Sequence, residues 1–400
     1  FTEDPQRFLG DEYSLEDYEQ VKDVVEVWFD SGSTHAFCLE QREDLKWPAS
    51  MYLEGSDQHR GWFHSSLLES CGTRGRAPFE SILSHGFVVD GKGMKMSKST
   101  GNVISPEDIL KNYGADILRV WVAASDYAED LRIDKSILTQ HAESYRKIRN
   151  TFRFMLGNLK DNFEPQDFKK IRLNEFDELE QYILHKIYNT NQSVKNNLVN
   201  YSFHKLYKDL LNFCTLDLSS FYFDIRKDIL YCDNLNSKKR KNCIVVLNIL
   251  LESLLKWFAP ILVFTSDEIY SLISKEEKSI HEYSFVQVPD NWKNTELNDK
   301  WDQLFKIKQE ANIAIEAKRS SKEIGSSLEA DVKLNVDEAK FELLKNLDLA
   351  EYLITSKAEK ILSKKKETKI EVRKAKGNKC QRCWKILENK CSRPECPINK

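Results

Sequence analysis

The chain has 400 residues, of which 41% are hydrophobic and 31% are charged, and its formal net charge is −3. This composition is ordinary for soluble globular domains and excludes a collagen-like or low-complexity chain. The length allows two or three domains with their own cores. The most apolar stretch, 243–264, is interrupted by Glu252, Lys256 and Pro260, so we expect a buried helix and a break rather than a membrane span.

The charge is distributed unevenly along the chain. Residues 357–400 hold 15 Lys and Arg against 5 Asp and Glu, a net charge of +10, which leaves −13 on the remainder. A basic tail on an acidic body indicates a polyanion contact near the C-terminus, although a solvated lysine-rich surface fits the charge alone equally well. We find no signal peptide, and because the chain starts at Phe1 in an acidic segment, we expect it to be part of a longer protein.

Residues 1–133 alternate short apolar runs with turns that contain glycine. We predict strands at 24–29, 49–55 and 82–89, and a helix at 64–72 that ends at its glycine. Strands that alternate with helices predict a parallel sheet covered on both faces, as in the doubly wound, Rossmann-like α/β class.

Helices then dominate. Ser105 followed by Pro106 and two carboxylates predicts a helix start, and Gly114 predicts its end, with a second helix following. Over 134–275 glycine is rare and apolar residues recur at intervals of three and four, which predicts an all-helical bundle. Residues 276–375 combine one helix with short alternating runs, which is typical of a small α+β region.

Four of the nine cysteines fall in the last 21 residues, with two, seven and four residues between them. The other five lie among apolar neighbours and are interpreted as buried side chains. The odd count and the clustering argue against a disulfide framework and favour a reducing compartment. Four thiolates in a finger over 376–400 are typical of one structural, tetrahedral Zn²⁺, because so short a segment has too little core to fold alone. The predicted ligands are Cys380, Cys383, Cys391 and Cys396.

The stretch DGKGMKMSKSTGN at 90–102 concentrates ammonium and hydroxyl groups on a glycine-bearing loop. Lys95 and Lys98 could neutralise charge on a leaving pyrophosphate, and the serines and backbone amides could donate to its oxygens. Alternating methionines, Met94 and Met96, could anchor such a loop. From composition alone, a solvated lysine-rich hairpin fits as well.

The stretch YLEGSDQHRGW at 52–62 has the pattern of a ligand-facing strand end. Glu54, Asp57 and Gln58 place acceptor groups beside Gly55, where a ligand can approach the backbone closely. Open parallel sheets bind ligands outside the carboxyl ends of their strands.

KMSKS, with HGF before it and GN after it, resembles the signature loop of the class I aminoacyl-tRNA synthetases. The chain from Val24 to its last cysteine resembles the bacterial-type isoleucyl-tRNA synthetase family, and the WFDSGS string separates it from the valine and leucine families. The matching stretches are 27–35, 52–63, 84–109, 114–127 and 212–232.

The resemblance implies the residues of the site. Lys95, Met96, Ser97, Lys98 and Ser99 would form the catalytic signature loop. ATP would be bound by Lys95, Lys98 and His85. Aminoacyl-adenylate would be bound by Glu54, Gly55, Asp57 and Gln58, with Trp28 and Trp62 beside the isoleucine side chain; without the resemblance, core packing would be the first interpretation of either tryptophan.

The resemblance also implies the reaction, the partners and the domains. Isoleucine would react with ATP, accompanied by Mg²⁺, and the acyl group would pass to tRNA-Ile, in a cytoplasmic and monomeric enzyme. The segments would be the second half of the catalytic nucleotide-binding domain at 1–133, an anticodon-binding helical domain at 134–275, a tRNA-contacting region at 276–375 and the zinc finger at 376–400. From the cations around the finger, Arg382, Lys385, Lys390 and Arg393, we expect it to meet tRNA phosphates, with a purely structural finger as the alternative.

Two departures from the family pattern stand out. The last cysteine pair has four intervening residues where two are usual. The second ATP signature, of the type His-Ile-Gly-His, does not occur, so the chain resembles the C-terminal portion of the enzyme without its editing insertion, and we expect it to be inactive alone. A non-catalytic tRNA- or nucleic-acid-binding zinc protein and a valine or leucine synthetase remain the alternatives.

Overall fold

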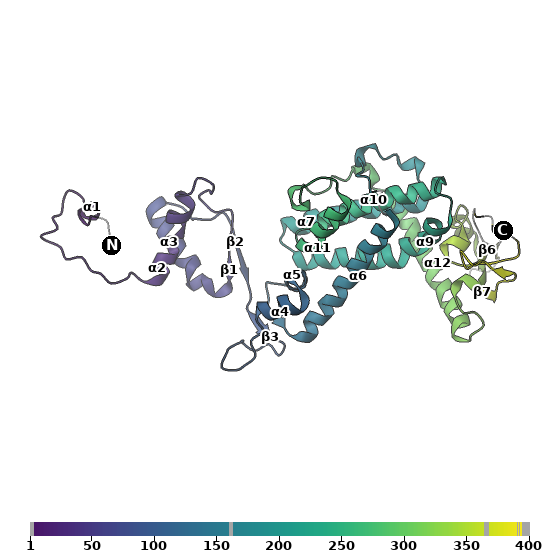
Figure 1. Ribbon diagram of the computed structural model, residues 1–400, viewed down its shortest axis with the longest axis horizontal. Helices are drawn as coiled ribbons and strands as arrows, with labels where there is room; N and C mark the ends of the chain where they lie inside the picture. The colour runs from purple at the N-terminus through teal and green to yellow at the C-terminus, as the bar shows by residue number, and fades with distance from the viewer. Residues whose placement is uncertain (1–3, 160–162, 364–367, 390, 392, 394–400) are drawn as a thin grey trace. The chain divides into compact units, whose positions relative to one another are not determined.

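The computed structural model describes residues 4–159, 163–363, 368–389, 391 and 393. It divides the chain into two compact units (Figure 1). The first comprises residues 1–103 and 127–133, and the second comprises residues 104–126 and 134–400.

The first unit contains two short parallel sheets. Its elements are α1 (Gln6–Leu9), α2 (Val27–Gly32), the π-helical η1 (His35–Glu40), β1 (Tyr52–Gly55), the 3-10 helix η2 (Ser56–Arg60), α3 (Trp62–Arg74), β2 (Ile82–His85), β3 (Val88–Asp90) and β4 (Leu131–Ile133).

The predicted parallel pairing is present, but the described residues of this unit do not form one doubly wound sheet. Strand β1 pairs in parallel with β2, and β3 pairs in parallel with β4, as separate two-stranded sheets. Leu53 and Ile82 remain 56% and 38% exposed. The predicted covering of both sheet faces is therefore wrong for β1 and β2 as they stand in this structure.

Three local predictions in this unit were wrong. Residues 27–32 form α2 instead of a strand, because the side chain of Glu26 accepts from the Trp28 amide and caps a helix. The strand at 82–89 breaks at Gly86, whose amide donates to Tyr127 O and where a side chain would clash with Glu129 O. Helix α3 ends at Arg74, two residues later than expected.

The end of α3 follows from backbone conformation. Gly75 adopts a left-handed conformation, with φ of 74°, and its amide donates to Cys71 O. That conformation costs glycine little and other residues more, so it closes the helix. Gly72 lies inside the helix. Cys71 is exposed and Cys38 is half-buried, so the prediction of five buried scattered cysteines holds only for the other three.

The second unit begins with helices. They are α4 (Pro106–Tyr113), α5 (Ala115–Ala124), α6 (Lys135–Leu159), α7 (Glu178–Val199), α8 (Phe203–Asn212), the π-helical η5 (Phe213–Tyr222), α9 (Phe223–Cys232), α10 (Lys238–Phe258) and α11 (Val263–Ile273), with short 3-10 turns η3 (Phe168–Lys170), η4 (Leu173–Glu175), η6 (Ile280–Glu282) and η7 (Asp290–Trp292).

The helix signals predicted in this part are confirmed. The Ser105 hydroxyl accepts from the Asp108 amide at 3.2 Å, and α4 ends before Gly114. Helix α10 is mostly buried, packs against α6, α7 and α11, and ends before Pro260 (Figure 1). In the described part of the chain, no helix combines the length and apolarity that a membrane crossing requires.

Two side chains of α5 make long-range contacts with the rest of the helical unit. The buried Asp116 carboxylate accepts from the backbone of Phe264 and from Thr265 at the start of α11. The Arg119 guanidinium donates to the carbonyls of Pro260 and Ile261. The domain bounds drawn from the sequence stay predictions, but the compact units divide the chain after residue 103.

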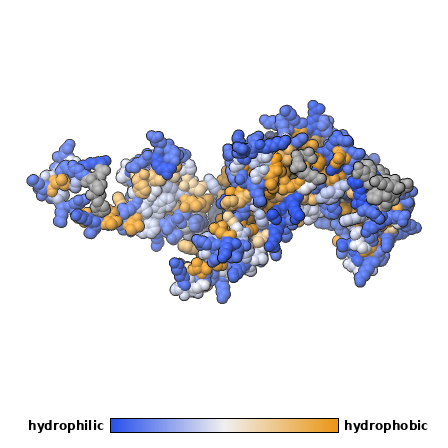
Figure 2. Space-filling view, in the orientation of Figure 1, coloured by the Kyte–Doolittle hydropathy of each residue, from blue (hydrophilic) through white to orange (hydrophobic). Residues whose placement is uncertain are grey.

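The helical bundle and the following α+β region share one core. The elements that follow are α12 (Thr295–Ser320), η8 (Ser327–Glu329), β5 (Ala330–Val336), α13 (Glu338–Leu343), α14 (Leu349–Tyr352), β6 (Lys357–Leu362), β7 (Lys369–Lys374), β8 (Asn378–Lys379) and β9 (Ile386–Leu387). Strand β5 alternates buried and half-buried residues between a parallel β6 and an antiparallel β7. We did not predict β6. Figure 2 shows hydrophilic residues over much of the visible surface, with hydrophobic patches among them.

Candidate active site and metal site

The first cluster lies at the carboxyl ends of β1 and β2. Because Gly55 stands opposite His85 in the parallel register, the two strands end at the same edge. The Glu54 carboxylate accepts from the Gly55 amide at 2.8 Å, and its Oε1 lies 3.9 Å from His85 Nε2. A side chain at Gly55 would come within 2.7 Å of Asp57 Oδ1, so glycine keeps this edge open.

The His85 ring is oriented by its own backbone. His85 Nδ1 lies 2.8 Å from Gly86 O, and because a carbonyl can only accept, Nδ1 carries the proton. Nε2 is then the ring nitrogen nearer to Glu54. In a neutral ring of this tautomer Nε2 is an acceptor, as the Glu54 carboxylate is, so the half-exposed imidazole and the exposed carboxylate offer acceptors at the strand ends.

The second cluster surrounds Gly61, just beyond the same strand end. Gln58 Oε1 accepts from the Trp62 amide at 2.9 Å, and Trp62 Nε1 donates to Ser31 O in α2 at 2.9 Å. Trp62 also stacks on Tyr52, with ring centroids 4.2 Å apart. Trp62 is therefore partly a packing residue, held between two elements.

Trp28 differs from Trp62 in its exposure. Its ring lies against Gly61, where an added Cβ would stand 3.1 Å from it, and 45% of the residue is exposed. Gln58 Nε2 donates to Asp57 Oδ2 at 3.1 Å, which connects this cluster to the group around Glu54. The structure therefore brings the predicted adenylate residues together at one strand end.

The signature loop presents its lysines to solvent. Lys95 and Lys98 are exposed, and in the described part of the chain neither makes an ion pair. The Ser97 hydroxyl lies 3.1 Å from the Ser99 hydroxyl and 2.6 Å from that of Thr100, so the loop folds on itself. No hydrogen bond or ion pair between described residues joins these lysines to Glu54 or His85.

Two residues that we did not predict hold the loop. Asp90 accepts from the amides of Lys92 and Met94 and from Asn102 Nδ2, and Asn102 Oδ1 accepts from the Ser97 amide. The hydrogen bond from Asn102, followed by that from the Met94 amide, lowers the pKa of the Asp90 carboxyl. The signal was present in the sequence, because Asp before Gly is typical of a side chain that caps its own turn.

The predicted anchoring by methionines is wrong for Met94, which is 63% exposed, whereas Met96 is half-buried. A flexible thioether makes no directional bond, so backbone amides bonded to one carboxylate determine the loop conformation instead.

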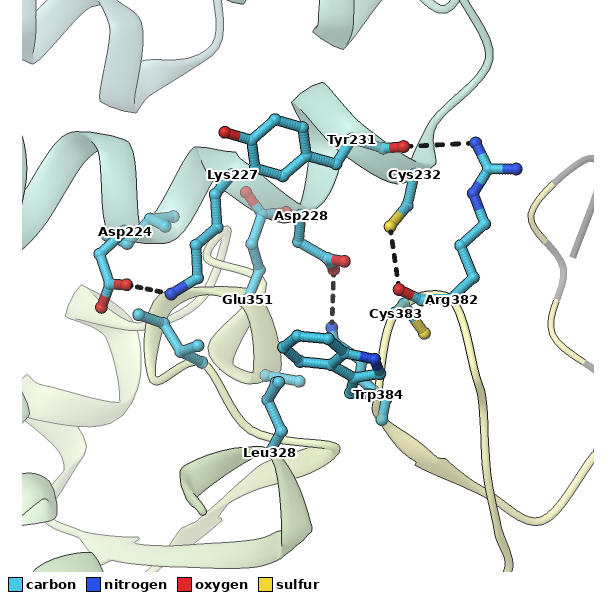
Figure 3. A pocket seen from close by; sticks show the side chains of 14 residues that line it. Asp224, Lys227, Asp228, Tyr231, Cys232, Leu328, Glu351, Arg382, Cys383 and Trp384 are labelled. Carbon is cyan, nitrogen blue, oxygen red and sulfur yellow. Dashed lines mark hydrogen bonds and ion pairs between the residues drawn. The ribbon is translucent and has the colours of Figure 1, made fainter. Parts of the chain in front are cut away.

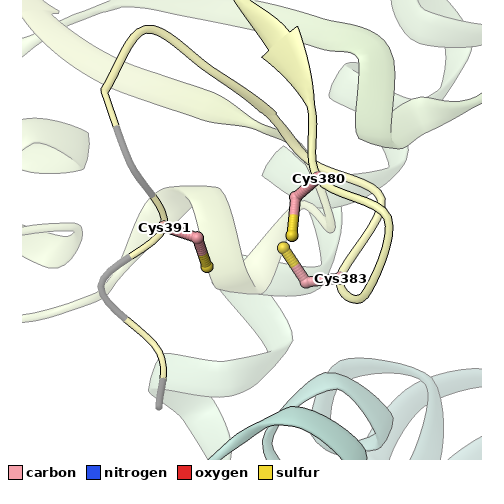
Figure 4. A group of neighbouring side chains, drawn as sticks. All are labelled: Cys380, Cys383 and Cys391. Atoms are coloured by element: carbon pink, nitrogen blue, oxygen red, sulfur yellow. The ribbon is translucent and has the colours of Figure 1, made fainter. Parts of the chain in front are cut away.

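The C-terminal segment contains a cluster of buried thiols. The Sγ atoms of Cys380, Cys383 and Cys391 all lie within 4.8 Å of one another (Figure 4). With Zn–S bonds of about 2.3 Å, a tetrahedral site needs sulfurs about 3.8 Å apart, so small adjustments would suffice. The three residues fit a zinc ion, and the fourth predicted ligand, Cys396, lies outside the described residues.

The finger is attached to α9 by ion pairs. Arg393 makes two 2.6 Å bonds to the Asp228 carboxylate and a third contact, at 3.0 Å, to Asp233. Lys385 lies 3.7 Å from Asp228. Our prediction that these two cations meet tRNA phosphates is not supported by this structure, because both already face carboxylates. Lys390 lies outside the described residues.

Comparisons with known proteins agree with this geometry. The family model "tRNA synthetases class I (I, L, M and V)" matches residues 2–134, and "Anticodon-binding domain of tRNA ligase" matches residues 180–334. A solved leucyl enzyme, LeuRS of Agrobacterium radiobacter K84 in a complex with tRNA and LeuAMS, covers 62% of this chain and 29% of its own at a TM-score of 0.51 and 16% identity, which shows likeness of fold. The chain is therefore similar to class I tRNA synthetases over residues 2–134 and to the anticodon-binding domain of tRNA ligases over residues 180–334.

The chain is also similar to isoleucine–tRNA ligases. The enzyme of Pelagibacter ubique (strain HTCC1062) is 66% identical over 98% of this chain and 43% of its own length. That of Zymomonas mobilis subsp. mobilis (strain ATCC 31821 / ZM4 / CP4) is 45% identical over 97% of this chain and 41% of its own length. The chain therefore spans less than half the length of these curated relatives.

Proposed function

We propose that this chain forms part of an isoleucine–tRNA ligase, which activates isoleucine with ATP and transfers it to tRNA-Ile. The observation that supports this most is the group of Glu54, Gly55, Asp57 and Gln58 at the open carboxyl end of β1, in a chain 66% identical to such a ligase. An α/β sheet binds its ligands at that edge.

The first step joins isoleucine to the α-phosphate of ATP and releases pyrophosphate. The isoleucine carboxylate is already ionised at pH 7, so the step needs no base from the protein. Positioning and charge stabilisation remain for the protein to provide. Lys95 and Lys98, which are exposed in this structure, would neutralise the leaving pyrophosphate when the loop closes.

The adenylate would occupy the strand edge. Carboxylate and amide oxygens of Glu54, Asp57 and Gln58 suit its ammonium and hydroxyl donors. Trp28, with an exposed ring beside Gly61, would contact the isoleucine side chain. Mg²⁺ bound with ATP would supply further neutralisation of phosphate charge.

The second unit would bind the tRNA. One structural Zn²⁺ held by Cys380, Cys383 and Cys391, with a further ligand, would maintain the finger that is attached to α9. Discrimination against valine depends on one methylene, worth about 1–3 kcal/mol. This enzyme family is the general example of a case where so small a difference requires a separate editing step. Cytoplasmic location and a monomeric state belong to the same proposal.

ATP–pyrophosphate exchange by the complete protein, with isoleucine, valine and leucine compared, tests the proposal. We expect isoleucine to be preferred and Lys98→Ala to lower the exchange rate by more than about 100-fold, because a transition-state contact of this kind is worth about 10²–10³. Lys92→Ala, an exposed lysine of the same loop, is the matched control and should lose less than about threefold.

Four results would contradict the proposal in different ways. Preferred activation of valine or leucine would change the amino acid. A loss of only tenfold for Lys98→Ala would remove the role of that residue. Exchange by the 400-residue chain alone would contradict our expectation that the chain is inactive without the rest of the enzyme, and tRNA binding without exchange by the complete protein would favour the non-catalytic zinc protein.

A further inference from the structure

The signature loop, residues 90–102, begins at the end of β3 (Figure 1) and contains two separate turns. The first turn closes where the Gly93 amide donates to Asp90 O at 2.8 Å. The second closes where the Gly101 amide donates to Lys98 O at 3.2 Å. Both glycines have a positive φ, 82° and 67°, which glycine adopts at little cost. Lys98 therefore stands on its own turn, apart from the turn that Asp90 starts.

The side chain of Asn102 joins the two turns. Its Nδ2 donates to Asp90 Oδ2 at 2.9 Å and to Lys95 O at 3.2 Å, and its Oδ1 accepts from the Ser97 amide at 3.0 Å. A carboxylate has no donor and a hydroxyl has only one, so neither could make all three bonds. The bond to Asp90 is charge-assisted, because the lowered pKa of that carboxyl keeps it ionised at neutral pH.

The two exposed lysines, Lys95 and Lys98, extend from the backbone that this amide group holds. Lys95 contributes one of the bonded carbonyls, and Lys98 lies one residue beyond Ser97, whose amide is bonded. Among the described residues, only the hydrogen bond to Asn102 links the turn at 97–101 to the remainder of the loop. The relative placement of the two ammonium groups therefore depends on one side chain.

We propose that Asn102 is a positioning residue, which makes the loop move as one preformed unit and so brings Lys95 and Lys98 to the leaving pyrophosphate together. The inference deepens the proposed function, on which it rests for the identity of the anion. A loop that had to order its backbone at each closure would lose conformational entropy each time. Bonds that are already present in the open loop avoid this loss, because the ammonium groups are oriented before the reaction.

The expected effect lies in kcat for ATP–pyrophosphate exchange by the complete enzyme. Asn102→Ala removes three hydrogen bonds, and each bond shifts an equilibrium about two- to tenfold, so we expect kcat to fall about 10- to 100-fold. Between described residues, no hydrogen bond or ion pair joins the loop lysines to Glu54 or His85. The KM for isoleucine should therefore stay within about twofold, since a loss confined to kcat marks contacts made in the transition state.

An exchange of two side chains distinguishes positioning from a general structural role. Asn102→Asp keeps an acceptor for the Ser97 amide but places a second carboxylate against Asp90, so it should lower kcat at least as much as Asn102→Ala. In the double variant Asp90→Asn/Asn102→Asp, the new amide donates to the new carboxylate, which still accepts from Ser97. We expect its kcat to exceed that of Asn102→Asp by about fivefold, the effect of one hydrogen bond.

A second comparison tests whether Asn102 acts through Lys98. In a Lys98→Ala background one of the positioned ammonium groups is gone, so Asn102→Ala should lower kcat by a factor at least about threefold smaller than in wild type. Asn112→Ala is the matched control, because this exposed asparagine of α4 donates to Asp108 O at 2.7 Å outside the loop. It should change kcat less than about twofold. The unfolding midpoint establishes that each variant is folded.

The outcomes separate this inference from the proposed function. If the complete wild-type enzyme catalyses no exchange with isoleucine, the proposed function fails. If it does, and folded Asn102→Ala keeps kcat within about threefold of wild type, the positioning role is overturned while the function stands. Equal losses from Asn102→Ala in the wild-type and Lys98→Ala backgrounds would overturn it as well. If Asn102→Ala does not fold, the exchange of side chains decides, and a double variant no more active than Asn102→Asp overturns the role.

Discussion

Replacement of Arg226 by methionine tests the contact that joins the helical bundle to the α+β region. Arg226 in α9 is 3% exposed, and its Nε and Nη2 donate to the two carboxylate oxygens of Glu180 in α7 at 2.6 and 2.7 Å. Its Nη1 reaches Glu351 in α14, which also pairs with Lys239. Glu180 has no exposed surface, so its charge depends on this one partner for compensation.

The expected cost follows from leaving that carboxylate buried and unpaired. Removing one partner of a buried ion pair costs about 3–5 kcal/mol, whereas replacing both partners by apolar side chains of similar size is often nearly neutral. We therefore expect Arg226→Met to lower the free energy of unfolding of the second unit by about 3–5 kcal/mol. The double variant Glu180→Leu/Arg226→Met should recover most of this, apart from about 1 kcal/mol for the Tyr222 hydroxyl, which loses its acceptor.

Urea unfolding followed by near-ultraviolet circular dichroism measures these differences, and amide exchange in α7 and α9 locates them. Arg319→Met is the matched control, because its pair with Glu316 is exposed and should be worth less than about 1 kcal/mol. A loss below 1 kcal/mol for Arg226→Met, or a double variant less stable than the single one, would refute the reasoning.

Three further predictions concern single residues. Asp116→Ala should lower the free energy of unfolding by about 0.5–2 kcal/mol in urea denaturation, because the carboxylate caps α11 through Thr265. Burial lowers the pKa of Lys308 to about 8. Between pH 8 and 10 the unfolded chain then binds more protons than the folded chain. The free energy of unfolding of wild type, measured by urea denaturation, should therefore rise by about 1–2 kcal/mol relative to that of Lys308→Met across that range. Asn102→Ala should speed amide exchange throughout 94–102, because it removes bonds to Ser97 and Asp90.

Each of these has its own check. An Asp116→Asn variant, which keeps an acceptor oxygen, should lose less stability than Asp116→Ala, and an equal loss would argue against capping. If the difference in free energy of unfolding between wild type and Lys308→Met does not change with pH, folding does not lower the pKa of Lys308. Because the pKa of Asp90 is lowered, its bonds are present above the ordinary Asp pKa and are lost as pH falls through the lowered value, so acid should reproduce the effect of Asn102→Ala on the loop.

The sequence by itself determined the features that depend on near neighbours. The start of α4 at Ser105 and its end before Gly114 are short-range capping effects, and both were predicted. Strand β5 alternates as expected because its period of two is written in consecutive residues. The spacing of the first three clustered cysteines likewise predicted a group of thiols that the fold brings together.

Only the tertiary structure decided the features that depend on distant partners. Residues 24–29 carry a strand-like run, yet the packing of α2 on α3 favours a helix from 27 onward. Arg393, expected to face phosphates, pairs with carboxylates of α9 that lie more than 150 residues earlier. A cavity of about 320 Å³ that is lined by α9 and by residues 382–385 is made by segments separated in the same way (Figure 3). Local propensities are worth a few tenths of a kcal/mol per residue, so burial and long-range ion pairs outweigh them wherever the two disagree.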